Sequence, residues 1–366
     1  MAVVLVVTSA PPLVEGGHIV IARALRHALE AAGHEADIVT TPSNRFGRQA
    51  AAYLANWCTD VGQTGDGRPV DHVISLRYPS YAVRHPRHVC WLNHTMREYY
   101  DLWDRFSAQL SWKGRVKEGF RRRLVHAADR YLLRQNVSRV VAQSQTIRDR
   151  LRTFGLVEAD VLYPPPPPRA YRCDGYDGDL LLVSRLTPLK RVDLVLRALA
   201  HPAAGDARLV VAGDGEQRRA LHELATDLGI ADRVVFAGHL SDEELVEHLA
   251  RCRAVVFAPY SEDFGFVTVE AFAAAKAVIT TTDSGGPAEL VVDGHNGRVV
   301  APDVEPLAAA IGALAADAAL AERLGRQGHA DTAHLTWAST VERLLEAGMP
   351  HRRTGTDRAG APPAVS

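Results

Sequence analysis

Residues 162–169 read LYPPPPPR, a run with five consecutive prolines from Pro164 to Pro168. Proline fixes the φ angle and has no backbone N–H, so neither a helix nor a central strand can pass through this segment. A stiff, extended linker is the expected structure. The chain of 366 residues is also longer than a typical single domain. The proline run therefore predicts two domains, 1–163 and 170–336, joined by residues 164–169.

The sequence has the same organisation on both sides of this linker. Strand-like runs alternate with helical stretches: VVLVVTS, EADIVTT, HVISLR, HVCWLNH and RVVAQS come before it, and DLLLVS, ARLVVAG, RVVFAG, AVVFAP, AVITT and GRVV after it. This alternation predicts an α/β fold with parallel sheets. Such sheets bind ligands at the carboxyl ends of their strands, so we expect the site in a cleft between the domains.

Composition excludes several classes of function. The formal net charge is −1, so no overall field points to nucleic acid, which we do not expect as a partner. No apolar run approaches the ~18 residues of a membrane span, and the apolar start MAVVLVVTSA lacks the basic region of a signal peptide. The four cysteines form no CxxC pair or Cys/His cluster, which predicts neither zinc nor disulfides. We expect a cytoplasmic protein.

Two cations mark the first βα loop of the second domain. In LLLVSRLTPLKRVDLVL, the strand should end near Ser184 and the helix should begin near Val192, so Arg185 and Lys190 lie between them. A helix N-terminus already attracts anions, and cations placed there are unfavourable unless an anion is present. The pair indicates an anion site, although a solvated basic loop has the same composition.

Two glycine pairs also stand between a strand and a helix. Gly213 and Gly215, in VVAGDGEQRR, resemble half of a dinucleotide fingerprint, but Arg218 occupies the third glycine position. Gly16 and Gly17 stand at the start of the first helix, where small residues let a phosphate or sugar approach the backbone. For both pairs a purely structural turn is an equally good interpretation.

The stretch YSEDFGFVTVEAFAAAK, residues 260–276, places two acids eight positions apart. A helix should begin near Phe266, with Gly265 at its N-terminus, so Glu262 lies in the loop and Glu270 about one turn inside the helix. A carboxylate accepts two hydrogen bonds at once, which suits the vicinal hydroxyls of a sugar or ribose. The alternative is that these acids only complement the helix dipole.

Together these residues place cations, a glycine turn and acids at one edge of one sheet, the pattern of a nucleotide-sugar site. No credible pair of acids for a metal lies at that edge. The DGD motif at residues 177–179 precedes the first strand of its domain, so it lies at the opposite edge, and we interpret it as a turn. We therefore predict no metal and no cofactor beyond the nucleotide sugar itself.

The same segments resemble the retaining glycosyltransferases of family 4, which have the GT-B fold of two Rossmann-like domains facing a cleft. The matching pieces are SRLTPLKRVDLVLRAL, LVVAGDGE, RVVFAGHLSDEEL, SEDFGFVTVEAFAAAKAVITT and SGGPAELVVDGHNG, in family order over nearly all of the second domain. The first domain matches more loosely, through EGGHIVIARALRHALEAAGHE, VAQSQTIRDRL and LYPP. The chain departs from the family at Asp263, where glycine is frequent, and this position bears on the choice of donor sugar.

The resemblance implies a role for each candidate residue. The two cations would hold the donor's diphosphate, Glu270 the ribose, and Glu262 the hexose, with the amides near Phe264 and Gly265. His94 ends the strand HVCWLNH and would touch the donor sugar; a core histidine under Trp91 and Tyr99 is the alternative. The expected catalytic residues are Arg185, Lys190, Glu262 and His94; the expected binding residues are Glu270, Phe264, Gly265, Phe266, Gly213, Gly215, Gly16 and Gly17.

The resemblance also implies that a last helix, residues 337–349, returns to the first domain before a disordered tail at 350–366. Residues 112–134 carry eight basic residues against two acids. Such a helix could contact anionic lipid or a phosphorylated acceptor, or it could be a solvated face.

The function expected is metal-independent, retaining transfer of a hexose from a GDP- or UDP-linked sugar. The acceptor could be a saccharide, a lipid-linked glycan or a small molecule. A non-hydrolysing nucleotide-sugar epimerase and a catalytically silent GT-B binding protein are the alternatives.

Overall fold

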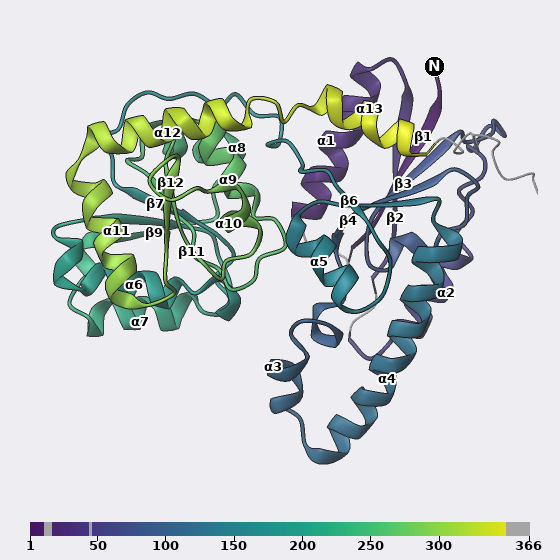
Figure 1. The fold of residues 1–366 in the computed structure, drawn as a ribbon, viewed down its shortest axis with the longest axis horizontal. Helices are drawn as coiled ribbons and strands as arrows, with labels where there is room; N and C mark the ends of the chain where they lie inside the picture. Colours follow the sequence, from purple (N-terminus) through teal and green to yellow (C-terminus); the bar gives the residue numbers. More distant parts are fainter. Residues whose placement is uncertain (11–16, 44–45, 349–366) are drawn as a thin grey trace, which may run out of the picture.

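The computed structural model of the protein describes residues 1–10, 17–43 and 46–348. Gly16 and the tail expected at 350–366 lie outside the described residues. The described chain forms two parallel six-stranded sheets, each covered by helices (Figure 1). The predicted α/β architecture is therefore confirmed.

The N-terminal sheet has the strand order β2-β1-β3-β4-β5-β6. Its central strands are apolar on both sides because helices cover both faces. The two-residue strand β6 is too short for its sequence to predict it. The strands are β1 (Val3–Ala10), β2 (Glu35–Pro42), β3 (His72–Arg77), β4 (His88–His94), β5 (Arg139–Ala142) and β6 (Asp160–Val161); the helices are α1 (Gly17–Ala31), α2 (Gln49–Trp57), α3 (Trp103–Ala108), α4 (Trp112–Tyr131) and α5 (Gln145–Thr153).

The C-terminal sheet has the strand order β12-β11-β10-β7-β8-β9. Its strands are β7 (Leu180–Val183), β8 (Leu209–Ala212), β9 (Val234–Gly238), β10 (Val255–Val256), β11 (Val278–Thr281) and β12 (Gly297–Val300). The helices around it are α6 (Val192–Ala200), α7 (Arg218–Asp227), α8 (Asp242–Arg251), α9 (Phe266–Ala273), α10 (Gly286–Leu290), α11 (Val304–Ala316) and α12 (Ala318–Thr332).

Each sheet contains one point at which the strand order reverses. In the C-terminal sheet the chain leaves β7 toward β8 and β9, then returns to build β10, β11 and β12 on the other side. In the N-terminal sheet the corresponding neighbours are β1 and β3. Loops that leave such neighbours diverge and open a crevice at the carboxyl edge, where ligands of α/β sheets bind.

The last helix, α13 (Trp337–Ala347), packs on the N-terminal sheet although the chain has just completed the C-terminal one. Val341 and Leu344 are buried in the same core as Trp91. The Trp337 indole donates a hydrogen bond of 3.0 Å to the carbonyl of Pro166 in the linker. The two segments that cross between the domains therefore touch each other.

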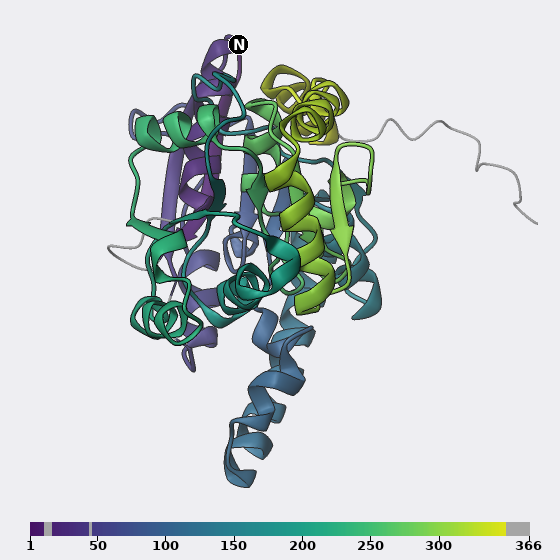
Figure 2. The same cartoon turned by 90° about the vertical axis from the view of Figure 1, so that its left-hand side faces the viewer.

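The helix α4 projects with α3 away from both sheets, as Figures 1 and 2 show. It begins at Ser111, whose hydroxyl accepts a hydrogen bond of 3.2 Å from the Gly114 amide, as expected for an N-cap. No single helix of the described residues is long and apolar enough to span a bilayer; residues 304–316 and 318–347 pass only as a pair bent by 102°, by length and composition alone.

The inner end of α4 is fixed by a buried carboxylate. Asp129 accepts hydrogen bonds from the hydroxyls of Tyr53, of Tyr81 at 2.5 Å and of Tyr100 at 2.6 Å, and it is fully buried. Burial raises the pKa of Asp129 to about 6, although the three tyrosine hydroxyls oppose the shift.

This raised pKa predicts a specific pH dependence of stability. An unfolded Asp titrates near ~3.9, so between about pH 4 and pH 6 the folded protein holds the Asp129 proton more tightly than the unfolded chain. The contribution of this group is therefore lost as the pH rises through about 6. Relative to Asp129→Asn, which does not titrate, the wild-type free energy of unfolding should fall by about 2 kcal/mol from pH 4 to pH 7. Urea unfolding of both proteins at each pH measures it; a constant difference contradicts the assignment.

Candidate functional site

A cavity of about 420 Å³ lies between the two domains. Its wall is formed by the ends of β3 and β4, the loops that follow β4, β5, β7 and β10, and the starts of α1 and α9, so it lies where both strand orders reverse. It brings together eight of the candidate residues: Gly17, His94, Arg185, Lys190, Glu262, Phe264, Gly265 and Phe266.

The loop after β7 carries both predicted cations to this cavity. Arg185 is exposed in it, and Lys190 ends one turn of 3-10 helix with its Nζ 2.5 Å from Glu262 Oε2. The next residue, Arg191, has a φ of 48°, a conformation that a non-glycine residue adopts only when its surroundings hold it there. Its guanidinium donates to the Asp283 carboxylate at 2.8 Å and to the Pro259 carbonyl at 2.7 Å. Arg191 therefore ties the loops after β7, β10 and β11 together, a role that its sequence position did not indicate.

The loop of Glu262 rests on the glycine start of α10. The Glu262 amide donates to Ser284 O at 2.7 Å, and the Gly286 amide donates to Glu262 O at 2.9 Å. Gly285 has a φ of 72°, and a Cβ at this position would lie 2.4 Å from Glu262 O. A glycine is required there for steric reasons, and it fixes the backbone that aims Glu262 at Lys190.

Of the other candidate glycines that the structure describes, Gly213 and Gly215 do not line the cavity. A Cβ on Gly213 would lie 1.9 Å from the Ser184 carbonyl oxygen, and one on Gly215 would lie 2.4 Å from that of Leu186. Both glycines therefore let the turn after β8 pack against the loop that carries Arg185. This geometry corresponds to the interpretation of the pair as a structural turn. The two glycines contribute to the site only by supporting the loop that carries Arg185.

Glu270 also lies outside the cavity wall. It is buried on α9, and its Oε1 accepts hydrogen bonds from Arg169 and, at 3.1 Å, from the Tyr171 hydroxyl. Arg169 also donates to Asp242 at 2.7 Å. Burial raises the pKa of Glu270, while the Arg169 charge and the Tyr171 hydroxyl oppose the shift. Among the described residues, no partner is found for Glu270 Oε2.

Asp263, the residue that departs from the family pattern, crosses between the domains. Its carboxylate lies 2.8 Å from His94 Nδ1 and accepts from Arg150 Nη1 at 2.5 Å, and Arg97 Nε lies 3.8 Å away. The Ser144 hydroxyl donates to its backbone carbonyl at 2.5 Å. Burial acts to raise the pKa of this carboxyl, but the charges of Arg150 and Arg97 and the His94 bond outweigh it and hold the pKa well below its usual range.

This contact orients the His94 ring. Because the Asp263 carboxylate only accepts, it favours the ring form with the proton on Nδ1, which leaves Nε2 as an acceptor. The His94 side chain is 34% exposed and lines the cavity, so it is not the fully buried core histidine that was the alternative.

A second carboxylate makes a similar crossing. Glu289 of α10 accepts from the amides of Gln145 at 2.7 Å and Thr146 at 2.6 Å, which are the first N–H groups of α5, and from the Tyr163 hydroxyl at 3.0 Å. An acid at a helix N-terminus is stabilised by the free amides and the dipole. Two acids of the C-terminal domain thus hold the β5–α5 junction of the N-terminal domain.

The cavity wall also contains polar groups that the sequence analysis missed. Arg77 ends β3 and His18 lies in the first turn of α1. Burial, with the nearby charges of Arg77, His94 and Arg185, lowers the pKa of His18 to about 4; burial also lowers the pKa of Arg77 to about 10. Among the described residues, His18 Nε2, Arg77 Nε and Asn93 Oδ1 are buried without a hydrogen-bond partner. Unpaired buried groups are costly, which indicates a polar ligand here. The position of Arg77 at a strand's carboxyl end was the signal available in the sequence.

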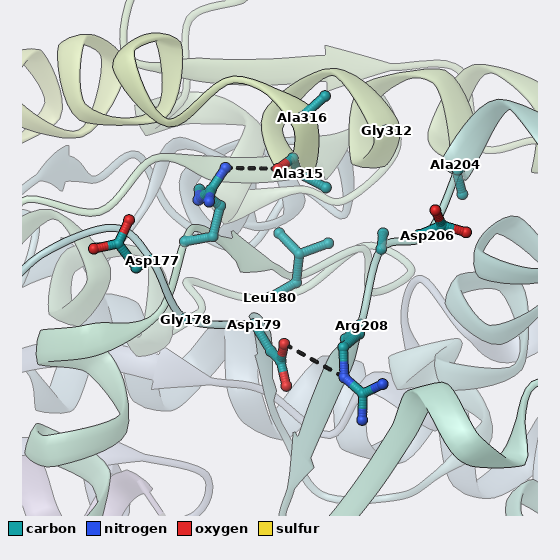
Figure 3. Close-up of a pocket in the computed structure, with 13 residues that line it drawn as sticks. Asp177, Gly178, Asp179, Leu180, Ala204, Asp206, Arg208, Gly312, Ala315 and Ala316 are labelled. Carbon is teal, nitrogen blue, oxygen red and sulfur yellow. Dashed lines mark hydrogen bonds and ion pairs between the residues drawn. The ribbon is translucent and has the colours of Figure 1, made fainter.

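The acids of the DGD motif lie at the opposite edge of the C-terminal sheet, as predicted. They border a separate pocket of about 380 Å³ (Figure 3). In it Asp177, Asp179 and Asp206 lie on different sides, and Asp179 is 3.8 Å from Arg208. No group of three or more metal-binding side chains occurs among the residues that the structure describes.

Comparisons with known proteins show what this chain is similar to in sequence and in fold. Residues 171–331 match the family described as Glycosyl transferases group 1. The D-inositol 3-phosphate glycosyltransferase of Stackebrandtia nassauensis is 34% identical over 52% of this chain and 46% of its own length. The GDP-mannose-dependent alpha-(1-6)-phosphatidylinositol monomannoside mannosyltransferase of Mycolicibacterium smegmatis is 34% identical over 52% and 53%. The chain thus spans about half the length of these curated relatives.

Solved structures show the shared fold over nearly the whole chain. Sucrose-phosphate synthase from Thermosynechococcus elongatus superposes with a TM-score of 0.71 at 18% identity, over 93% of this chain and 97% of that one. HepE from Anabaena, determined with UDP and glucose, gives 0.64 at 18% identity, over 93% and 98%. The fold is GT-B, and residues 171–331 are similar to the group 1 glycosyltransferases.

The contacts of Asp263 generate a prediction about His94. Asp263→Ala removes a buried negative charge that Arg97 and Arg150 face, and it should lower the free energy of unfolding by about 2–3 kcal/mol. The loss should be smaller than for arginines left without any partner, because Asp101 still pairs with both of them. Asp263→Asn keeps the size and should shift the His94 proton away from Nδ1, which ¹⁵N chemical shifts of the imidazole report. Asp104→Ala, on the exposed side of α3, is the control. An unchanged His94 tautomer in Asp263→Asn would show that Asp263 does not position this ring.

Proposed function

We propose that the protein transfers a hexose from a nucleotide-diphosphate sugar to an acceptor, without a metal and with retention of configuration. The observation that carries this proposal is the cavity lined by Arg185 and Lys190 of one loop and Glu262 of another, with Lys190 facing Glu262, where both strand orders reverse. Polar atoms in its wall that lack partners support a ligand rich in hydrogen-bonding groups.

The charges of the cavity suggest how the reaction is assisted. Breaking the bond between sugar and phosphate places negative charge on the departing diphosphate. Arg185 and Lys190 would stabilise that charge from the loop after β7. Lys190 would exchange its contact with Glu262 for a phosphate oxygen, which frees Glu262 to bind hydroxyls of the hexose.

The remaining candidates have supporting roles in this proposal. His94, held by Asp263, would offer Nε2 to a donor-sugar hydroxyl, and the departing phosphate oxygen would take the acceptor's proton. Glu270 would hold ribose hydroxyls through Oε2 while Arg169 keeps its other oxygen. Names of relatives support both GDP- and UDP-linked donors: one is called GDP-mannose-dependent, and one structure contains UDP.

The proposal does not commit to one class of acceptor. A saccharide, a lipid-linked glycan and a small molecule are all compatible with an open cavity of this size. No specific observation favours the epimerase or the silent binding protein; conversion of the donor without an acceptor would distinguish the first, and nucleotide-sugar binding without turnover the second.

A thermal-shift screen over UDP-, GDP- and ADP-sugars tests the proposal. The correct donor at 100 times its Kd should add about 2.7 kcal/mol to the free energy of unfolding. Turnover with that donor should survive EDTA. Activity that EDTA abolishes and Mg²⁺ or Mn²⁺ restores contradicts metal independence, and the absence of any nucleotide-sugar shift contradicts the proposed site.

Arg185→Ala and Lys190→Ala should each lower kcat by about 100- to 1000-fold, because the charge that they stabilise grows in the transition state. Arg219→Ala is a matched control, since Arg219 is exposed on α7 away from the cavity. Steady-state kinetics of the three variants measure the effect. A change in KM alone would mean that these cations bind only the ground-state donor.

A further inference from the structure

The outward face of α4 carries an unusual concentration of apolar side chains. Ten large apolar side chains of the described residues are exposed, and five of them stand on this one helix. They form what we call the apolar row: Trp112 (71% exposed), Val116 (69%), Phe120 (62%), Leu124 (55%) and Tyr131 (57%). At about 100° per residue they lie within an arc of about 120°, on the side opposite the buried Val125 and Asp129.

The charges of α4 are sorted by sign. Both of its acids are buried: Glu118 accepts from Tyr99 at 2.6 Å and Arg121 at 2.7 Å, and Asp129 is held by the tyrosines described above. The exposed charged residues of the helix are all basic: Lys113, Arg115, Lys117, Arg123 and Arg130. Its outer surface is therefore cationic and apolar at once, which neither a solvated face nor a bundle helix requires.

We infer that the apolar row and the basic residues beside it form a docking surface for an anionic lipid bilayer. Helices that lie in a membrane interface place aromatic and aliphatic side chains at the acyl boundary and Lys or Arg among the headgroups. Because α4 projects beyond both sheets, its outer face can reach a flat surface (Figures 1 and 2). This inference goes beyond the proposed function and does not depend on it.

Charge favours a bilayer over the other occupants. A second copy that paired with α4 about a two-fold axis would set basic residues against the same basic residues. A nucleic acid would be attracted by the charge and could stack on the aromatic rings of the row, but it would leave Val116 and Leu124 without an apolar partner, and the chain as a whole has a net charge of −1. A fluid anionic surface uses both properties and needs no matching pocket.

Flotation of the full chain with vesicles tests the inference. The wild-type protein should float with vesicles containing phosphatidylglycerol at about one third of the lipid, bind much more weakly to pure phosphatidylcholine, and lose binding as the salt concentration rises. Trp112 supplies a local probe, because subtracting the emission spectrum of Trp112→Phe from that of the wild type isolates the emission of this one side chain. On binding to anionic vesicles, the Trp112 emission should shift to shorter wavelength, and lipids with brominated acyl chains should quench it.

Two sets of variants separate the two components of the surface. Lys113→Gln, Lys117→Gln and Arg123→Gln together should weaken binding to the anionic vesicles by on the order of 100-fold. Val116→Ser, Phe120→Ser and Leu124→Ser together should weaken it by more than about tenfold. All six side chains face solvent, so melting temperatures should not change.

Matched controls come from the C-terminal domain. Arg219→Gln, Arg251→Gln and Arg326→Gln remove the same number of exposed positive charges, and Val235→Ser with Val292→Ser removes exposed apolar side chains; both sets should bind as the wild type does. The inference is overturned by absence of binding to anionic vesicles, by equal losses in the control sets, by a dimer that the serine variants abolish, or by RNA or DNA binding that exceeds binding to vesicles. None of these measurements depends on catalytic activity, so they can be interpreted even if the proposed function is wrong.

Discussion

The cavity depends on one carboxylate that one domain places inside the other. Asp263 stands in the loop after β10, yet Arg150, Arg97 and His94 of the N-terminal domain surround it. Glu289 makes a parallel crossing a short distance away, at the first amides of α5. A buried carboxylate is costly without partners, and here every partner belongs to the opposite domain. The two domains are therefore held in the arrangement that gives the cavity its wall, and the same contact orients the His94 ring.

Opposite charges neutralise one another both in the cavity and on the helix that begins at it. Lys190 faces Glu262 in the cavity wall, and Arg169 faces Glu270 on α9, outside that wall. Each pair joins residues from different segments of the chain, so neither acid is left unpaired to repel an incoming diphosphate. A ligand with a phosphate at one end and hydroxyls at the other can bind both members of such a pair. The phosphate accepts hydrogen bonds from the cation, and the hydroxyls donate hydrogen bonds to the carboxylate.

Local pattern in the sequence was sufficient for the fold and for part of the site. The alternation of strands and helices and the glycine before Phe266 depend on near neighbours, and the structure contains the elements that they predict. The domain boundary at the proline run stays a prediction. The loop that carries Arg185 and Lys190 could be located because it follows a strand and precedes a helix. Residues defined by contacts across the domain interface could not be found in this way. Glu289 looked like an ordinary helical acid, and Arg169 like the end of a linker, because their partners stand more than 100 positions away. On α4 the sequence shows the number of charges, but only the packing shows that both acids are buried and that apolar side chains remain outside.

The return of α13 to the N-terminal sheet has a consequence for synthesis of the protein. The core around Trp91 is completed by Val341 and Leu344, residues that the ribosome adds after the whole C-terminal domain. During synthesis, the apolar surface that α13 later covers is therefore exposed on the first domain. The second domain can fold before the core of the first domain is complete. The first 163 residues alone therefore lack part of the core that the whole chain forms around Trp91, and a shortened chain that ends at Thr336 would expose the apolar surface that α13 covers.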